Sequence, residues 1–532
     1  MPSPDSGTAA VVRPAAISAQ GWGWRHAGRT APAIHALDLD IRPGERVLLL
    51  GPSGAGKSTL LHALAGVLGE EGDDADETGS LLVDGVSPKA RRGRAGLMQQ
   101  DPETQVVLSR LGDDVAFGAE NLCVARDEIW NRVHEALDDV GLRNSASGNF
   151  ALDHPTSALS GGQKQRLALA GILAMRPGLI LLDEPTANLD PAGVLEVRDA
   201  VGRCLDKTGA TLVVVEHRVS VWKDLVDRIV VLQPGSSSAT AGSTPAVLLD
   251  GNPDTVLAQA RDMLTAAGVW VPGYVPITRP RSGTAGGSGT TSGGELLLAT
   301  HELAVSRERA RRRGFKTVPP LPVQAGLDAE VFAGQALTIT GPNGAGKSTF
   351  ALTLAGLLAP VSGTVTAAVG LSDGAGADPF KWKAQQLISR IGTVFQEPEH
   401  QFVTGRVLDE LMFGPKHLGH GEDRVDELLE RLRLRHLVDA NPYTLSGGEK
   451  RRLSVATVLA AHPRVLVLDE PTFGQDANTW AELASFLSEL LDDGTSVVSV
   501  THDQEFSSVL GGREMRLVPA FQDGTRQEAG AA

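Results

Sequence analysis

Short aliphatic runs alternate along this chain with longer segments whose apolar residues recur at helical spacing. Three runs, Arg46–Leu50, Leu179–Leu182 and Thr211–Val215, are rich in aliphatic or β-branched residues, which is typical of parallel strands covered on both faces. A glycine-rich loop follows the first run, and the pattern then predicts a helix over Ser58–Leu68. Strands that alternate with helices predict an α/β fold with mainly parallel sheets.

Four motifs occur twice in the same order. The copies lie at Gly51–Thr59 and Gly341–Thr349 (GPSGAGKST and GPNGAGKST), Leu159–Gly162 and Leu445–Gly448 (LSGG), Leu181–Thr186 and Val467–Thr472 (LLDEPT and VLDEPT), and His217 and His502. The two copies of each motif are separated by 285 to 290 residues. The sequence therefore predicts two duplicated domains.

The segment between the two copies has the composition of a tether. Residues 278–294 (TRPRSGTAGGSGTTSGG) are rich in Gly, Ser and Thr, so we expect a flexible linker there. The first domain then spans residues 1–277 and the second spans residues 295–532. Just before the linker, helical spacing predicts small appended helices, on Val247, Leu248, Val256, Leu257, Met263 and Leu264.

Composition narrows the class of protein. The 532 residues include 49 Lys+Arg and 64 Asp+Glu, a net charge of -15 that argues against a general nucleic-acid binder. No apolar run approaches the ~18–20 residues that cross a bilayer, and residues 1–20 carry no signal-peptide pattern. Cys123 and Cys204 have no metal-ligand spacing. We expect a cytoplasmic protein whose membrane association, if any, is peripheral.

The repeated glycine loops have the pattern that binds phosphates. In G-x-x-x-x-G-K-[ST], backbone N–H groups surround the phosphates at the N-terminus of a helix. Lys57 and Lys347 are expected to reach the β- and γ-phosphates, and Ser58 and Ser348 to ligate Mg²⁺. A lone match can be a glycine-rich turn with an exposed lysine, but two matches between a strand and a helix favour ATP binding.

Two acidic residues end an apolar strand in each half. An unpaired carboxylate at such a place is costly, and a bound Mg²⁺ removes that cost. Asp183 and Asp469 are therefore expected to hold the Mg²⁺ shell, and the adjacent Glu184 and Glu470 to polarise the attacking water.

A glycine loop, LSGG, DEPT and a later histidine, in this order, resemble the nucleotide-binding domain of ABC transporters. The resemblance covers nearly all of each half, and LSGG is its most specific element. It implies that each domain has an antiparallel β subdomain and a helical subdomain beside the parallel sheet. It also implies that the two domains pair head to tail, so that ATP lies between the glycine loop of one and the LSGG of the other.

Each site residue follows from that resemblance. The first site would be Gly51, Pro52, Ser53, Gly54, Ala55, Gly56, Lys57, Ser58, Thr59, Gln100, Asp183, Glu184 and His217 with Ser446, Gly447 and Gly448. The second would be Gly341, Pro342, Asn343, Gly344, Ala345, Gly346, Lys347, Ser348, Thr349, Gln396, Asp469, Glu470 and His502 with Ser160, Gly161 and Gly162. Both sets are complete, so both sites are expected to be competent, with the glutamines near Mg²⁺ and the water. Trp24 and His26 are the candidates for stacking on adenine in the first half. The arginine-rich stretch Val305–Lys316, with only Phe315, offers no obvious equivalent in the second.

The segments after the glutamines narrow the resemblance. QDPETQVVLSRLGDDVAFG and QEPEHQFVTGRVLDELMFG are similar to the energy-coupling factor (ECF) importers of vitamins and transition-metal ions. The resemblance implies two partners, an integral-membrane ECF subunit and a small substrate-binding membrane subunit. The acidic pairs Asp113–Asp114 and Asp409–Glu410 would meet arginines of coupling helices. The alternative is a soluble twin-ABC ATPase such as a ribosome-associated translation factor. The sequence does not identify the cargo.

Overall fold

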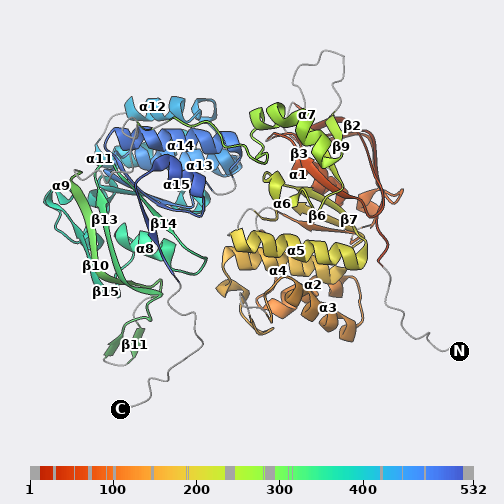
Figure 1. Ribbon diagram of the computed structural model, residues 1–532, viewed down its shortest axis with the longest axis horizontal. Helices are drawn as coiled ribbons and strands as arrows, with labels where there is room; N and C mark the ends of the chain where they lie inside the picture. Colours follow the sequence, from red (N-terminus) through yellow and green to blue (C-terminus); the bar gives the residue numbers. More distant parts are fainter. Residues whose placement is uncertain are drawn as a thin grey trace. The chain divides into compact units, whose positions relative to one another are not determined.

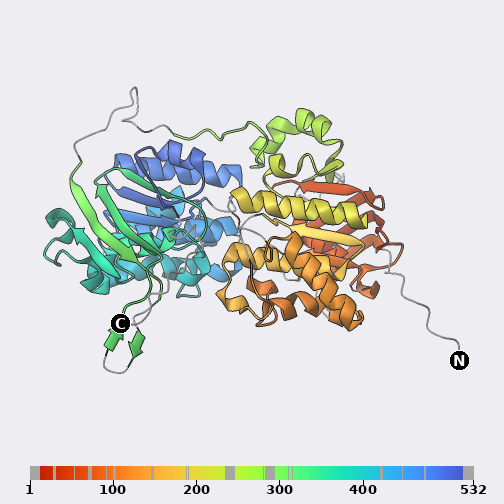
Figure 2. The ribbon, with the colours of Figure 1, turned by 60° about the horizontal axis from the view of Figure 1, so that its bottom comes forward.

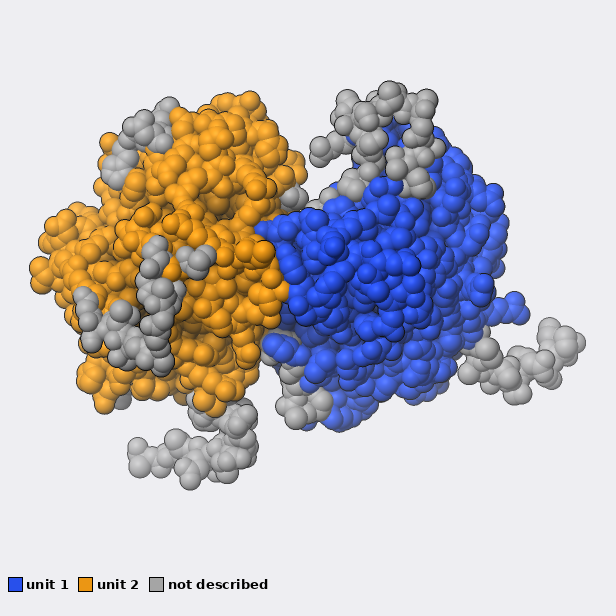
Figure 3. Space-filling model, turned by 45° about the horizontal axis from the view of Figure 1, so that its top comes forward, with its two compact units in different colours: residues 1–274, 476–478 blue, residues 275–475, 479–532 orange. Residues whose placement is uncertain are grey.

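The computed structural model describes residues 12–27, 31–52, 54–69, 75–91, 93–99, 103–144, 149–186, 189, 191–233, 246–279, 281, 294–308, 311–313, 316–419, 423–445, 447–472 and 475–518. The chain divides into two compact units, residues 1–274 with 476–478 and residues 275–475 with 479–532 (Figure 3). Within the described part of the chain, none of the helices combines the length and apolarity needed to cross a bilayer.

A six-stranded sheet forms the centre of the first unit (Figure 1). Its order is β5-β6-β7-β3-β8-β9, and all neighbouring pairs are parallel except β8 with β9. Leu48 and Leu50 pack into the core on one face of β3, and Val47 and Leu49 pack into the core on the other. The strands are β3 (Arg46–Leu50), β5 (Ala95–Met98), β6 (Leu179–Asp183), β7 (Thr211–Val215), β8 (Arg228–Leu232) and β9 (Val247–Gly251).

Different elements cover the two faces of this sheet. The face of Val47 and Leu49 shares a core with α1 (Lys57–Leu64) and with an antiparallel sheet of order β2-β1-β4. That sheet consists of β1 (Ile17–Arg25), β2 (Ile34–Ile41) and β4 (Asp76–Val83). The other face shares a core with helices that include α2 (Leu111–Asn121), α3 (Arg126–Asp139), α4 (Gly161–Met175), α5 (Pro191–Thr208), α6 (Val219–Trp222) and α7 (Pro253–Ala266).

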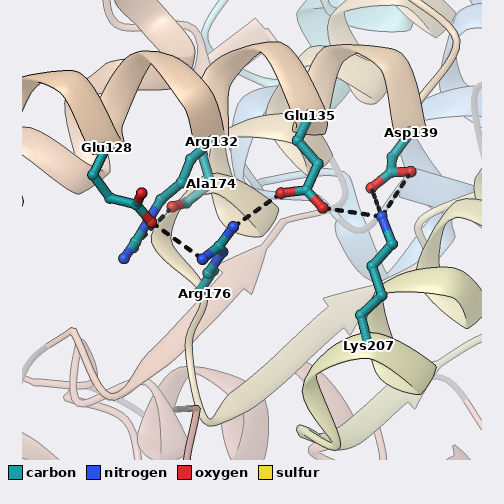
Figure 4. A network of polar contacts seen from close by, with 7 residues as sticks. All are labelled: Glu128, Arg132, Glu135, Asp139, Ala174, Arg176 and Lys207. Atoms are coloured by element: carbon teal, nitrogen blue, oxygen red, sulfur yellow. Dashed lines mark hydrogen bonds and ion pairs between the residues drawn. The ribbon is translucent and has the colours of Figure 1, made fainter. Parts of the chain in front are cut away.

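A polar network joins α3 to the end of α4 and to α5 (Figure 4). Arg176, directly after α4, donates to Glu128 at 3.2 Å and to Glu135 at 2.9 Å. Lys207 of α5 donates to Glu135 at 3.0 Å and to Asp139 at 3.2 Å. The helical part of the unit is therefore fixed to the core by charged contacts as well as by apolar packing.

The second unit repeats this plan. Its parallel sheet has the order β16-β17-β18-β14-β19, made of β14 (Ala336–Thr340), β16 (Ile391–Val394), β17 (Val465–Asp469), β18 (Ser496–Val500) and β19 (Arg513–Arg516). The antiparallel sheet β13-β10-β15 consists of β10 (Leu296–Val305), β13 (Gln324–Phe332) and β15 (Ser362–Ala367). A separate hairpin, β11 (Arg311–Arg313) with β12 (Lys316–Val318), lies between β10 and β13 in the sequence (Figure 2).

The helices of the second unit follow the order of the first, except that two short helices are added between β15 and β16. They are α8 (Lys347–Leu354), α9 (Val369–Ser372), α10 (Ala384–Ile388), α11 (Val407–Leu418), α12 (Asp423–Arg431), α13 (Gly447–Leu459), α14 (Ala477–Asp492) and α15 (Gln504–Leu510). The predicted fold class, two P-loop domains that each have a parallel core, an antiparallel sheet and a helical part, is confirmed.

Two local predictions need correction. Val247 and Leu248, predicted to be helical, belong to β9, which pairs antiparallel with β8; only the later residues form a helix, α7. The start of the predicted linker is bound to the second unit rather than free, because the Nη2 of Arg281 donates to the Gly334 carbonyl at 2.8 Å and its Nη1 to the Leu510 carbonyl at 3.1 Å. Residues 280 and 282–293 lie outside the described residues.

Candidate active sites

Glycine is required by the backbone of the first phosphate-type loop. Gly51 follows β3 with φ 147°, and a Cβ there would lie 2.4 Å from the Leu232 carbonyl oxygen. Gly56 precedes α1 with φ 81°, and its Cβ would lie 2.3 Å from Cγ1 of Ile34. The loop is therefore a close turn packed against β8 and β2, and its backbone leads directly into α1. Ser53 lies outside the described residues.

The side chain of the loop lysine is hydrogen-bonded to the backbone of the loop. Lys57 is buried, and its Nζ donates to the carbonyls of Gly51 at 2.8 Å and Pro52 at 3.0 Å. Burial lowers the pKa of Lys57, and the charges of Glu184 and Asp183 act in the opposite direction. The ammonium group and the two carboxylates therefore lie close enough to interact, as one site requires.

The end of β6 carries the acidic pair. Asp183 is buried, and burial raises its pKa to about 6, while a hydrogen bond from Ser58 opposes the rise. Glu184 has a left-handed backbone, φ 49°, and its Oε1 lies 3.0 Å from Nε2 of His217. The hydrogen bond and charge of Glu184 outweigh burial and raise the pKa of His217. Ser58 and Asp183 thus meet at one point, and Glu184 and His217 at another.

The second site has the same residues in a different pattern of contacts. Ser348 Oγ donates to Asp469 at 2.9 Å. Lys347 Nζ lies 2.9 Å from His502 Nε2, which is 3.6 Å from Glu470 Oε1. Burial raises the pKa of Glu470 to about 7. The histidine here pairs with the lysine more closely than with the glutamate.

The serine and aspartate fit Mg²⁺ in both units. Mg²⁺ prefers hard oxygen ligands, and each site brings one hydroxyl to a buried carboxylate. That carboxylate has a raised pKa in both copies because it is buried. A divalent cation would compensate the buried charge, so the donor set suits the metal.

The serine-glycine motifs begin helices. Ser160 caps α4: its hydroxyl accepts from Gln163 N, and the Gln163 side chain accepts from Ser160 N at 2.9 Å. Ser160 and Gly161 are exposed, and the helix N-terminus is therefore open to an anion. Gly447 and Gly448 begin α13 in the second unit, whereas Ser446 lies outside the described residues.

Only one of the two predicted glutamines lies among the residues that the structure describes. Gln100 lies outside the described residues, and Gln396 is an exposed residue just after β16. The Gln396 carbonyl accepts from the buried Arg451 at 2.7 Å, and the Phe395 carbonyl accepts from the same guanidinium at 2.8 Å. Sequence reasoning missed Arg451, because an arginine three residues after LSGG on a helix is usually a solvated charge.

One adenine candidate is wrong. Trp24 is buried, 5% exposed, in the core between the antiparallel sheet and α1, so its ring is not available to a base. His26 is exposed, and its Nε2 lies 3.2 Å from Oγ1 of Thr59 in the loop motif. His26 remains the candidate in the first unit. Phe315 lies outside the described residues.

In each acidic pair after the glutamines, one acid is hydrogen-bonded to the backbone of the same unit and the other is exposed. Asp114 accepts from the backbone N–H groups of Val107 at 2.8 Å and Leu108 at 2.7 Å. Glu410 accepts from those of Val403 and Thr404 in the same way. The prediction that both acids of each pair face a partner therefore needs correction, because only Asp113 and Asp409 are exposed.

Apolar side chains stand beside the exposed acids. Phe117 is one helical turn after Asp113 on α2 and is 39% exposed, and Phe413 is one turn after Asp409 on α11 and is 45% exposed. Val107 and Val403 are 58% and 65% exposed. We call these the docking pads: Asp113, Phe117 and Val107 in the first unit, and Asp409, Phe413 and Val403 in the second.

These features define the class of protein. A glycine loop between the central strand of a parallel sheet and a helix, with a Ser-Asp pair and a Glu-His pair, is the site of a P-loop nucleoside triphosphatase, present here twice. The family model described as ABC transporter matches residues 34–187 and 325–473. The chain belongs to the ABC transporter family and is an ATPase.

Known relatives agree with this family. The chain is 35% identical over 492 residues to the "Putative HMP/thiamine import ATP-binding protein YkoD" of Bacillus subtilis, covering 90% of this chain and 85% of that protein. It is 32% identical to a "Putative ABC transporter ATP-binding protein" of Methanosarcina acetivorans, covering 94% and 84%. The solved structure of the archaeal ribosome recycling factor aABCE1 with stalk protein aP1 is similar with a TM-score of 0.56 at 21% identity, covering 93% of this chain and 87% of that one, which shows a shared fold.

Proposed function

We propose that this chain is the energy-coupling ATPase of an ECF-type importer for a vitamin or a transition-metal ion. It would act on a separate integral-membrane subunit and a small substrate-binding membrane subunit, at the cytoplasmic face of the membrane. The observation that carries the proposal is the pair of docking pads, which recur at matching positions on the two units. The relative from Bacillus subtilis, named for HMP/thiamine import, adds support for a vitamin as cargo.

Each site would bind one Mg-ATP. Lys57 and Lys347 would contact the phosphates; Ser58 with Asp183, and Ser348 with Asp469, would hold Mg²⁺. The metal would neutralise charge that develops on the phosphates. Glu184 and Glu470 would orient the attacking water, and His217 and His502 would donate to the γ-phosphate. We propose that Gln100 and Gln396 complete the two sets.

The serine-glycine motif of each unit would close the site of the other. Ser160, Gly161 and Gly162 offer a hydroxyl, backbone N–H groups and a helix N-terminus, which suit a γ-phosphate. Gly447 and Gly448, with Ser446, would do the same for the first site. Closure would then require the triphosphate, and hydrolysis would allow the two units to part. This intramolecular pairing would transmit the cycle to helices bound at the docking pads.

The chemistry of the docking pads defines the partner they fit. Each pad combines one exposed carboxylate with an exposed phenylalanine and valine, and the second acid of the pair only shapes the loop. An amphipathic helix that carries an arginine between apolar residues is complementary to this surface. The two pads would hold two such helices, one on each unit.

Replacement of the exposed acids tests the proposal. The variant Asp113→Arg with Asp409→Arg is expressed in cells that lack the unaltered chain. We expect it to show no membrane association and no uptake of HMP or thiamine. The purified variant should keep its ATPase rate, because exposed charges contribute little to stability. The matched control is Asp224→Arg with Asp493→Arg, which makes the same charge change at exposed positions outside the pads. Normal membrane association of the pad variant, or sedimentation of the chain with ribosomes, would exclude the importer role.

A further inference from the structure

A buried carboxylate beside the first active site has no part in the mechanism above. Glu216 follows β7 directly, precedes His217, and is only 5% exposed. Its Oε1 accepts from the Thr186 backbone N–H at 3.0 Å and from the Thr186 hydroxyl. Its Oε2 accepts from the His217 backbone N–H at 3.2 Å. Three donors thus converge on one carboxylate. Burial raises the pKa of Glu216, and the hydrogen bonds from Thr186 oppose that rise.

These bonds close a ring around the catalytic pair. Glu184 and Thr186 are separated by one proline, Glu216 and His217 are adjacent, and the Glu184–His217 contact at 3.0 Å completes the ring. Glu184 has φ 49°, a backbone state that costs about 1 kcal/mol for a residue other than glycine. Its own N–H donates to the Val215 carbonyl at 2.9 Å. The strained residue is therefore anchored to β7 by its own N–H and to the end of β7 through Thr186.

The second site lacks one side of this ring. The residue in the place of Glu216 is Thr501, which is fully buried and accepts from the Asp503 backbone N–H at 3.0 Å. Glu470 keeps φ 47° and its bond to the Val500 carbonyl at 2.9 Å. Among the described residues of this site, no hydrogen bond joins Thr501 to Thr472, the counterpart of Thr186. The Glu470–His502 distance is 3.6 Å, and His502 lies nearer to Lys347.

We propose that Glu216 is a positioning residue of the first site, which locks the Glu184 turn to His217, and that the second site works without this lock. The proposal rests on the catalytic roles proposed above for Glu184 and His217. The two ATP sites of this chain are then unequal in rate even though their motifs are equally complete. The first site would hydrolyse ATP faster, because its water-orienting glutamate is held closer to the histidine.

Single-turnover hydrolysis in a Glu470→Gln background isolates the first site. In this background we expect Glu216→Thr, which copies the second site, to lower the hydrolysis rate about tenfold, as loss of a partner behind a catalytic residue commonly does. The Kd for a fluorescent ATP analogue should stay unchanged, because Glu216 does not reach the phosphates. The control is Thr211→Val at the other end of β7, a buried residue whose hydroxyl donates to the Ala15 carbonyl at 2.6 Å. It should lower stability and leave the rate unchanged.

The conservative variant separates positioning from folding. The amide oxygen of Glu216→Gln can still accept from Thr186, so this variant should recover most of the rate near neutral pH. The charged groups that face His217 are Glu184, Lys57, Glu216 and Asp183. Loss of the Glu216 charge lowers the pKa of His217, so the alkaline limb of the rate profile should move to lower pH.

Three outcomes have distinct meanings. A full rate in Glu216→Thr, with Glu184→Gln inactive, overturns the inference and leaves the proposed site intact. A full rate in Glu184→Gln overturns the proposed site itself. If Glu216→Thr does not fold, Glu216→Ala decides: it also removes the acceptor for the Thr186 hydrogen bonds, so a full rate in that variant contradicts the lock.

Discussion

Two glycines of the first loop offer a matched pair for testing how this loop is built. Gly54 and Gly56 both have φ 81°, so an alanine at either position carries the same backbone strain, about 1 kcal/mol. The space around the new methyl group differs. At Gly54 no atom lies within 4 Å of the Cβ, whereas at Gly56 the Cβ would lie 2.3 Å from Cγ1 of Ile34 and 2.6 Å from the Ala33 carbonyl oxygen.

The expected losses follow from these distances. Gly54→Ala should cost only the strain, about 1 kcal/mol. Gly56→Ala should cost about 1–3 kcal/mol more, because the carbonyl and the isoleucine must move. Thermal unfolding of the nucleotide-free chain should therefore show a shift of roughly 2–4 °C for Gly54→Ala and a clearly larger one for Gly56→Ala. Equal shifts would refute the reasoning.

Two other variants test the second unit. Burial raises the pKa of Glu470 in the folded chain to about 7, above the pKa of the same group in the unfolded chain. Without nucleotide, this group therefore destabilises the fold least at a pH below the unfolded pKa, and stability is lost as the pH rises through 7. Chemical unfolding at pH 8 should find Glu470→Gln more stable than the unaltered chain by up to about 3 kcal/mol, and a gain as large at pH 4 would contradict this cause. Arg281→Ala removes the hydrogen bonds to the Gly334 and Leu510 carbonyls and should lower the free energy of unfolding by about 2–3 kcal/mol. The control is Arg279→Ala, which removes a half-exposed salt bridge to Glu489 and should cost under about 1 kcal/mol. Similar losses in the two variants would argue against the anchoring role of Arg281.

The sequence predicts most of the fold because its signals are local. The run Arg46–Leu50, the following loop and the acids after β6 each lie within one strand or turn, and the structure places them as expected. The predicted helix over Ser58–Leu68 ends earlier, at Leu64, because Gly66 turns the chain with φ 74°. Periodicity also misassigned Val247, since a short strand and the first turn of a helix give similar apolar spacing.

The missed features depend on long-range pairing. Glu216 and Thr186 are 30 residues apart and meet only because β6 and β7 pair with Asp183 beside Val215. Nothing in the sequence near either residue indicates that contact. Trp24 is misjudged for another reason: an aromatic residue on a strand that precedes the glycine loop indicates a base platform, but whether its ring points outward depends on how the antiparallel sheet packs.

The helix after the serine-glycine motif contacts different candidate site residues in the two units. Gln165 and Arg451 occupy the same place in the repeat, 286 residues apart, and both are buried. The Gln165 side chain donates to the Glu184 carbonyl at 3.3 Å, whereas Arg451 donates to the Phe395 and Gln396 carbonyls. A rotation of α4 would therefore act on the backbone of Glu184, and a rotation of α13 on the segment that carries Gln396. Duplication has kept the phosphate-binding motifs alike while the buried contacts behind them have diverged, so any functional difference between the sites should be sought in those contacts.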